Sequence, residues 1–165
     1  MGIVALGACG LLPDDQATAD RPPGVGVVTH PVDGDTVDVE IGGVEERVRL
    51  IGIDTPESVA PNRPVECYGP EAKARLAELI PPGTEVRLER DVEARDQYGR
   101  LLAYVFRTAD GLHVNESLVR DGYAEARRYE PNVARQAELD AAEVEARAAD
   151  RGLWPVCGGT NTPLP

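Results

Sequence analysis

The sequence has 165 residues, which suits one domain with a single core and leaves little room for two. Hydrophobic residues make up 42% of the chain and aromatic residues only 4%, so the core is expected to consist mainly of Val, Leu, Ile and Ala. The net charge of −12 argues against a broadly basic surface of the kind that holds duplex nucleic acid. Any contact with a phosphate is therefore expected to rest on a few local arginines.

The start of the chain is typical of an export segment. Residues 3–10 are apolar and end in small residues around Cys9, and residues 6–9 resemble the lipobox of bacterial lipoproteins, in which the cysteine is lipidated. We expect residues 1–9 to be a short or truncated lipoprotein-type signal and residues 10–24, rich in Asp and Pro, to be a disordered linker. A plain N-terminal tail is the alternative, because the apolar stretch is short and lacks a basic flank.

Five β-strands are predicted from short stretches in which apolar and polar residues alternate or apolar residues dominate. They are residues 25–32, 36–41, 44–53, 85–90 and 101–107. Turn residues separate several of them, among which Gly42-Gly43 is typical of a two-residue hairpin. A long loop with several prolines follows the third strand.

Three helices are predicted after that loop. The first covers residues 70–79 and the second residues 114–121, closed by Gly122. Asn132 is expected to cap the N-terminus of the last helix, and Gly152 is expected to end this helix. One face of it is expected to carry Val133, Ala137, Ala141, Val144 and Ala148. Five strands with about three helices indicate an α+β fold built on a small closed barrel, of which the oligonucleotide-binding (OB) fold is one example.

Residues suited to phosphate chemistry occur in three short motifs. These are Asp33-Gly34-Asp35-Thr36 followed by Arg49, then Asp54-Thr55-Pro56-Glu57, then Tyr98-Gly99-Arg100. Carboxylate oxygens suit a hard divalent cation, guanidinium groups bind phosphate oxygens, and a further carboxylate can act as a general base. Taken singly each motif is weak, because Asp-Gly-Asp is usually a turn and most arginines form surface ion pairs. Together they indicate metal-assisted cleavage of a phosphodiester.

The order and spacing of these motifs resemble the staphylococcal nuclease (thermonuclease) family. The similarity continues in the segments 65–72, 102–104 and 114–120 and extends over about residues 25–154, which we expect to be the nuclease domain, with residues 155–165 as a tail. The resemblance implies an OB-fold five-stranded barrel. It also implies one Ca²⁺ held by Asp35, Asp54 and the main-chain carbonyl of Thr55, while Asp33 orients waters beside the metal.

The resemblance further implies that Glu57 is the general base and that Arg49 and Arg100 clamp the scissile phosphate. Tyr98 and Tyr129 match positions that line the nucleotide pocket. Arg127 stands where the better-known member has a tyrosine, and Gln97 stands where it has a lysine, so base preference is open.

Arg49 and Asp54 raise a geometric question, because they are an odd number of residues apart. An unbroken strand would point them to opposite faces. Gly52 is a candidate for a bulge or bend that brings them together.

Cys67 and Cys157 form an even pair in a small domain, which predicts a disulfide if the chain is exported. Two free thiols in a cytosolic protein are the alternative. We expect an exported, monomeric, Ca²⁺-dependent nuclease that cuts DNA and RNA, preferably single-stranded or frayed, outside the cell or anchored to its envelope through Cys9. The alternatives are a non-catalytic nucleic-acid- or protein-binding module of the same fold, and a cell-surface domain that calcium merely stabilises.

Overall fold

The computed structural model describes residues 21–58 and 64–164, so the expected signal, the expected lipidation site Cys9 and most of the expected linker lie outside the described residues. The strands are β1 (Val25–Asp33), β2 (Thr36–Ile41), β3 (Val44–Leu50), β4 (Ile53–Asp54), β5 (Glu85–Glu89), β6 (Leu101–Arg107) and β7 (Glu125–Ala126). The helices are α1 (Gly69–Leu79), α2 (Val114–Arg120), α3 (Gln136–Ala148) and α4 (Leu153–Cys157). None of the helices within these ranges has both the length and the apolar character to span a membrane.

Five strands close into a barrel in the order β1-β2-β3-β6-β5, and β1 pairs with β5 to complete it. All neighbours are antiparallel except β3 and β6, which run parallel. The predicted α+β fold, an OB-type five-stranded barrel with about three helices, is confirmed. The short helix α4 was not predicted.

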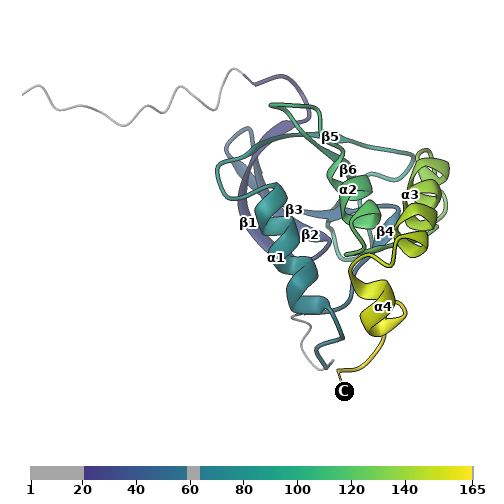
Figure 1. Ribbon diagram of the computed structural model, residues 1–165. Helices are drawn as coiled ribbons and strands as arrows, with labels where there is room; N and C mark the ends of the chain where they lie inside the picture. Colours follow the sequence, from purple (N-terminus) through teal and green to yellow (C-terminus); the bar gives the residue numbers. More distant parts are fainter. Residues whose placement is uncertain (1–20, 59–63, 165) are drawn as a thin grey trace, which may run out of the picture.

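The barrel interior is filled by aliphatic side chains, as the shortage of aromatic residues implies. Val37, Val39, Val48 and Leu50 are fully buried, and Tyr104 is the largest side chain among the completely buried ones. Helix α1 covers one side of the barrel, α2 and α3 lie together on another, and α4 lies near the C-terminal end (Figure 1).

The third strand is shorter than predicted, because it ends at Leu50 instead of residue 53. Ile51 and Gly52 turn the chain, and Gly52 adopts φ +76°, a left-handed conformation that favours glycine. The strand β4 that follows pairs with β7 and not with the barrel. The expectation of a break at Gly52 is therefore confirmed, and the break separates the strand of Arg49 from the strand of Asp54.

The predicted buried face of the last helix was wrong. Ala137, Ala141, Val144 and Ala148 are exposed, and the helix buries Gln136, Leu139, Ala142 and Ala146. Leu139 and Val144 are five positions apart, so one helix face cannot hold both, and the larger Leu139 packs into the core.

The predicted cap of this helix was also wrong, because the N-cap residue is Arg135. Asn132 instead accepts a hydrogen bond from the main-chain N–H of Glu93 and donates one to its carbonyl.

Candidate active site

An acidic cavity of about 210 Å³ opens beside the corner between β3 and β4. It brings together most of the residues that the sequence singled out: Asp33, Asp35, Arg49, Asp54, Thr55, Glu57 and Arg100. Thr36, Glu66 and Asn161 complete its wall. Most of them come from the strands β1 to β4, the turn between β1 and β2 and the loops after β4 and before β6, so the folded barrel assembles them, while Asn161 comes from the chain after α4.

Arg49 lies at the centre of this site, and its side chain is only 13% exposed. One Nη group is 3.0 Å from Asp35 Oδ2 and 3.7 Å from Asp54 Oδ1. The guanidinium also donates to the main-chain carbonyls of Leu50 and Ile53, at 2.5 and 3.1 Å. Arg49 is therefore fixed by the corner itself and carries a positive charge to the place where the two aspartates converge.

Asp54 is held between two arginines. In addition to Arg49, Arg127 contacts it, with Nη2 3.0 Å from Asp54 Oδ2. The main-chain N–H of Arg127 donates to the carbonyl of Gly52. Burial raises the pKa of Asp54 above its ordinary value, the two arginines oppose this rise, and repulsion from Asp35 and Glu125 adds to it. A further cation would therefore stabilise the carboxylate of Asp54, which is partly buried and repelled by other carboxylates.

Asp33 and Glu57 interact through their side chains on another part of the wall. Burial raises the pKa of Asp33, and the hydrogen bond with Glu57 adds to the rise, while Ser58 and the N–H of Gly34 oppose it. Asp33 therefore holds a proton more readily than an exposed aspartate does, and when protonated it donates to Glu57.

Arg100 reaches the cavity from the turn before β6. Its Nε donates to Asp96 Oδ2 at 2.7 Å, while Asp96 Oδ1 accepts from the N–H groups of Tyr98 and Arg100. Burial would raise the pKa of Asp96, but the hydrogen bonds and charge of Arg100, together with the N–H of Tyr98, outweigh it and lower the pKa. One carboxylate thus orients both the turn and the guanidinium.

A second cavity of about 310 Å³ shares Arg49 and Arg100 with the first. Tyr98 and Tyr129 line it and are exposed, with Tyr98 76% accessible to solvent. Arg127 contacts Asp54 and is not among the residues that line either cavity. A larger cavity of about 330 Å³ near Ile41 and Leu88 contains none of the residues predicted for the site.

The atoms that Arg49 contacts are all oxygens, and oxygen atoms are the ligands that a hard cation such as Ca²⁺ takes. Within residues 21–58 and 64–164, no three His, Cys, Asp or Glu side chains already converge around one point as metal ligands. In the structure, the guanidinium of Arg49 supplies the positive charge between Asp35 and Asp54 that a metal ion would otherwise supply. The residues present therefore fit a calcium ion in their chemistry, with Arg49 as a competing charge.

Two residues of the cavity wall, Glu66 and Asn161, were not predicted as part of the site. Cys67 and Cys157 form a disulfide, as expected, with their Cα atoms 5.9 Å apart. This bond draws the chain beyond α4 to the wall of the cavity. The predicted disulfide was thus the signal from which the position of Asn161 could have been inferred.

The chain is similar to known proteins over most of its length. The family described as "Staphylococcal nuclease homologue" matches residues 47–156. A thermonuclease of Staphylococcus hyicus is 39% identical over 127 residues, which cover 77% of this chain and 73% of that protein. A thermonuclease of Staphylococcus intermedius is 40% identical (78% and 74% covered), and endonuclease YncB of Bacillus subtilis is also 40% identical (77% and 60% covered). The chain therefore belongs to the staphylococcal nuclease family.

Proposed function

We propose that this chain is an exported, Ca²⁺-dependent nuclease that hydrolyses phosphodiester bonds of DNA and RNA with little sequence specificity. The similarity to thermonucleases and an endonuclease supports nuclease activity. The observation that carries the proposal further is the position of Arg49 and Arg100, which line both the acidic cavity and the cavity of Tyr98 and Tyr129. A phosphate bound at these arginines would leave its nucleotide beside the tyrosines.

Asp35, Asp54 and the main-chain carbonyl of Thr55 would hold the calcium ion, which supplies charge stabilisation at the phosphate when bound. Asp33 orients water beside this site. Once another cation neutralises Asp35 and Asp54, the charge of Arg49 would be released from them to a phosphate, while its bonds to the carbonyls of Leu50 and Ile53 keep the guanidinium at the corner.

Glu57 acts as the general base. It takes a proton from a water molecule that attacks phosphorus in line, the bond from phosphorus to the 5′ oxygen breaks, and this oxygen takes a proton from solvent, which leaves a 3′-phosphate and a 5′-hydroxyl end. Arg49 and Arg100 bind the equatorial oxygens, where charge builds in the transition state. Phosphate contacts carry no sequence information, so specificity is loose.

The strongly acidic chain favours single-stranded or frayed substrates, because it offers little general attraction to a duplex. The disulfide supports an oxidising compartment outside the cytosol. We propose that the protein acts as a monomer, and that a lipid on Cys9 anchors it to the cell envelope.

Single-turnover and steady-state rates on a single-stranded DNA oligonucleotide test this proposal. We expect activity with Ca²⁺ and none in excess chelator. Glu57→Gln should lower the rate by roughly 10²–10⁴, since it removes the base and keeps the shape. Arg100→Ala should lower the rate by roughly 10²–10³, as the loss of one preorganised donor does.

Arg107→Ala is the matched control for Arg100→Ala. Both arginines donate from Nε to a nearby aspartate, and their side chains are 28% and 30% exposed, but Arg107 does not line the cavities described above. Its loss should leave the rate within about threefold of wild type, since its partners, Asp110 and the carbonyl of Leu79, do not line the two cavities either. Near-wild-type turnover of Glu57→Gln, or full activity in chelator, would favour a non-catalytic binding module or a different mechanism.

A further inference from the structure

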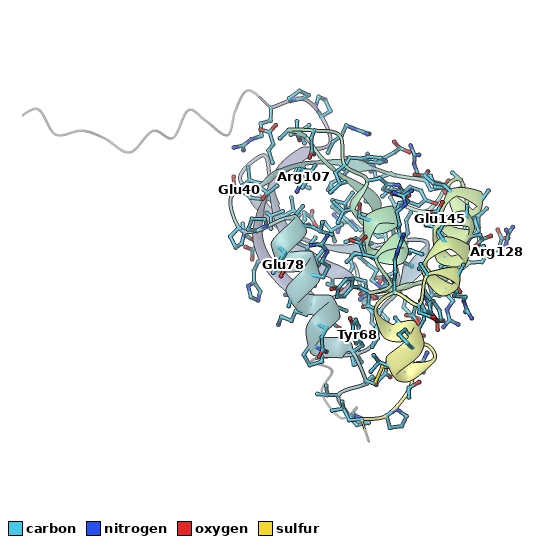
Figure 2. The ribbon with its side chains drawn as sticks, viewed as in Figure 1. Glu40, Tyr68, Glu78, Arg107, Arg128 and Glu145 are labelled. Atoms are coloured by element: carbon cyan, nitrogen blue, oxygen red, sulfur yellow. A yellow bond between two sulfur atoms is a disulfide. The ribbon has the colours of Figure 1, made fainter. Side chains whose placement is uncertain are left out.

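The chain beyond α4 folds back along the wall of the acidic cavity. We call residues 158–164 the C-terminal strap. It begins directly after Cys157, whose disulfide partner Cys67 also donates its main-chain N–H to the carbonyl of Thr162 at 2.8 Å. The end of the chain accordingly lies beside the start of α1 (Figure 1), and Tyr68 marks this junction between α1 and α4 (Figure 2).

Glu66 joins the strap to the loop that carries Glu57. Its Oε2 accepts hydrogen bonds from the N–H of Glu57 at 3.0 Å and from the N–H of Asn161 at 3.2 Å. Its own N–H donates to the carbonyl of Glu57 at 2.8 Å. Glu66 is only 8% exposed, so protein N–H groups such as these must replace the water that would solvate an exposed carboxylate.

The main chain of Glu57 is also confined from another side. A Cβ atom at Gly69, the first residue of α1, would collide with the carbonyl of Glu57, so the two backbones are in close contact there. Glu57 therefore lies between the start of α1 and Glu66, and its position depends on both.

The strap has a second attachment, beside Asp54. The N–H of Thr160 donates to Glu125 at 2.7 Å, and the Thr160 hydroxyl lies 3.5 Å from Asp54 Oδ2. The strap thus extends from the strand of Asp54 to the carboxylate that holds Glu57, and the disulfide fixes its beginning.

We propose that Glu66 is a positioning residue for Glu57, and that the disulfide-anchored strap holds Glu66 in the orientation this requires. The inference rests on the proposed function, in which Glu57 is the general base. A base must lie within hydrogen-bond reach of the attacking water, and a displacement of about 1 Å can cost roughly 100-fold in rate. Without the strap, Glu66 loses the N–H of Asn161, so its carboxylate is held less firmly against the N–H of Glu57.

A kinetic cycle on the whole chain tests the inference. We would compare wild type, Glu66→Ala, the double variant Cys67→Ser/Cys157→Ser and their combination, using a single-stranded DNA oligonucleotide at saturating Ca²⁺. Each change should lower kcat by roughly 10- to 100-fold while KM stays within about threefold. Because both act through one link, the combination should be no slower than the slower parent.

A conservative variant and a matched control separate positioning from general stability. Glu66→Gln should recover most of the lost kcat, because its amide oxygen can accept from both N–H groups. Glu116→Ala removes another buried glutamate, 7% exposed and paired with Arg120, and should lower the melting temperature with kcat unchanged. Should the cysteine variant fail to fold, Glu66→Ala and Glu66→Gln decide the question.

Three results would overturn the inference: wild-type kcat for Glu66→Ala, a loss confined to KM, or fully additive losses in the cycle. Glu57→Gln assayed in parallel tells this failure from that of the proposed function. If Glu57→Gln is inactive and Glu66→Ala is fully active, only the positioning role is lost. If Glu57→Gln is itself fully active, Glu57 is not the base and both proposals fall.

Discussion

Asn115 is the residue whose replacement should most damage the scaffold of the site. It is completely buried, and its side chain serves three main-chain groups. Oδ1 accepts from the N–H of Val105 at 2.9 Å, while Nδ2 donates to the carbonyls of Ile51 and Ala103, at 2.8 and 3.4 Å. The bond to Ile51 secures the corner between β3 and β4, on which Arg49 and Asp54 depend.

Asn115→Ala removes these partners and leaves at least two buried polar groups without hydrogen bonds. Each such group costs about 1–3 kcal/mol, so we expect the free energy of unfolding to fall by about 2–6 kcal/mol. For a domain of this size that lowers the melting temperature by roughly 4 to 24 °C. Activity at a temperature where the variant is still folded should fall as well, because the corner loses its support.

Asn132→Ala is the matched control for this experiment. Asn132 is only 3% exposed, but both of its partners are main-chain groups of Glu93, which is itself exposed. Water can replace the lost amide there, so we expect a loss of only about 1 kcal/mol. Urea unfolding followed by circular dichroism gives both values. Equal losses for the two variants, or less than about 1 kcal/mol for Asn115→Ala, would refute the reasoning.

Two further predictions concern stability. Reduction of the Cys67–Cys157 disulfide, which spans a sequence separation of 90, should lower the free energy of unfolding by about 4–5 kcal/mol if loop-closure entropy governs the effect. Thermal melting with and without reductant measures this loss, and an unchanged melting temperature would contradict the prediction. Burial lowers the pKa of His113 below its ordinary value despite the opposing hydrogen bond with Glu138, so the unfolded chain binds a proton at a higher pH than the folded chain does. The contribution of neutral His113 to the free energy of unfolding should therefore be fully present above pH 6.5. It should be lost as the pH falls below 6.5 toward the folded pKa of His113. Urea midpoints between pH 5 and 7 should show this slope, and His113→Gln should flatten it; a slope that persists in the variant assigns it to other groups.

Local patterns predicted the barrel strands well, because alternation and turn residues act over a few neighbouring positions. They could not predict β4 and β7, which have two residues each and form by pairing segments far apart in the sequence. The buried face of α3 was missed because alanines are frequent on all sides of this helix. The choice between Leu139 and Val144 depends on contacts with the barrel, and periodicity does not report those.

The sequence motifs identified most of the residues that line the acidic cavity, because the family pattern is carried by short, ordered segments. Their mutual contacts were not predictable. The ion pairs that join Arg49 to Asp35 and Arg127 to Asp54 depend on the corner at Gly52 and on the pairing of β4 with β7. Glu66 was missed because its contact with Asn161 joins segments that are far apart in the sequence and that the disulfide holds together.

The parallel pairing of β3 with β6 has a consequence for the order in which the protein is made. Antiparallel hairpins such as β1–β2 form between neighbours, whereas a parallel pair needs a long crossover, here from Val48 to Leu101. Arg49 and Arg100 therefore meet only after the chain has been translated beyond β6. A growing chain on the ribosome carries Arg49, Asp54 and Glu57 well before it can bring Arg100 to them. On the proposed function, the nascent polypeptide should therefore leave the surrounding ribosomal and messenger RNA intact until β6 has been synthesised, because Arg100 cannot join the acidic cavity before then.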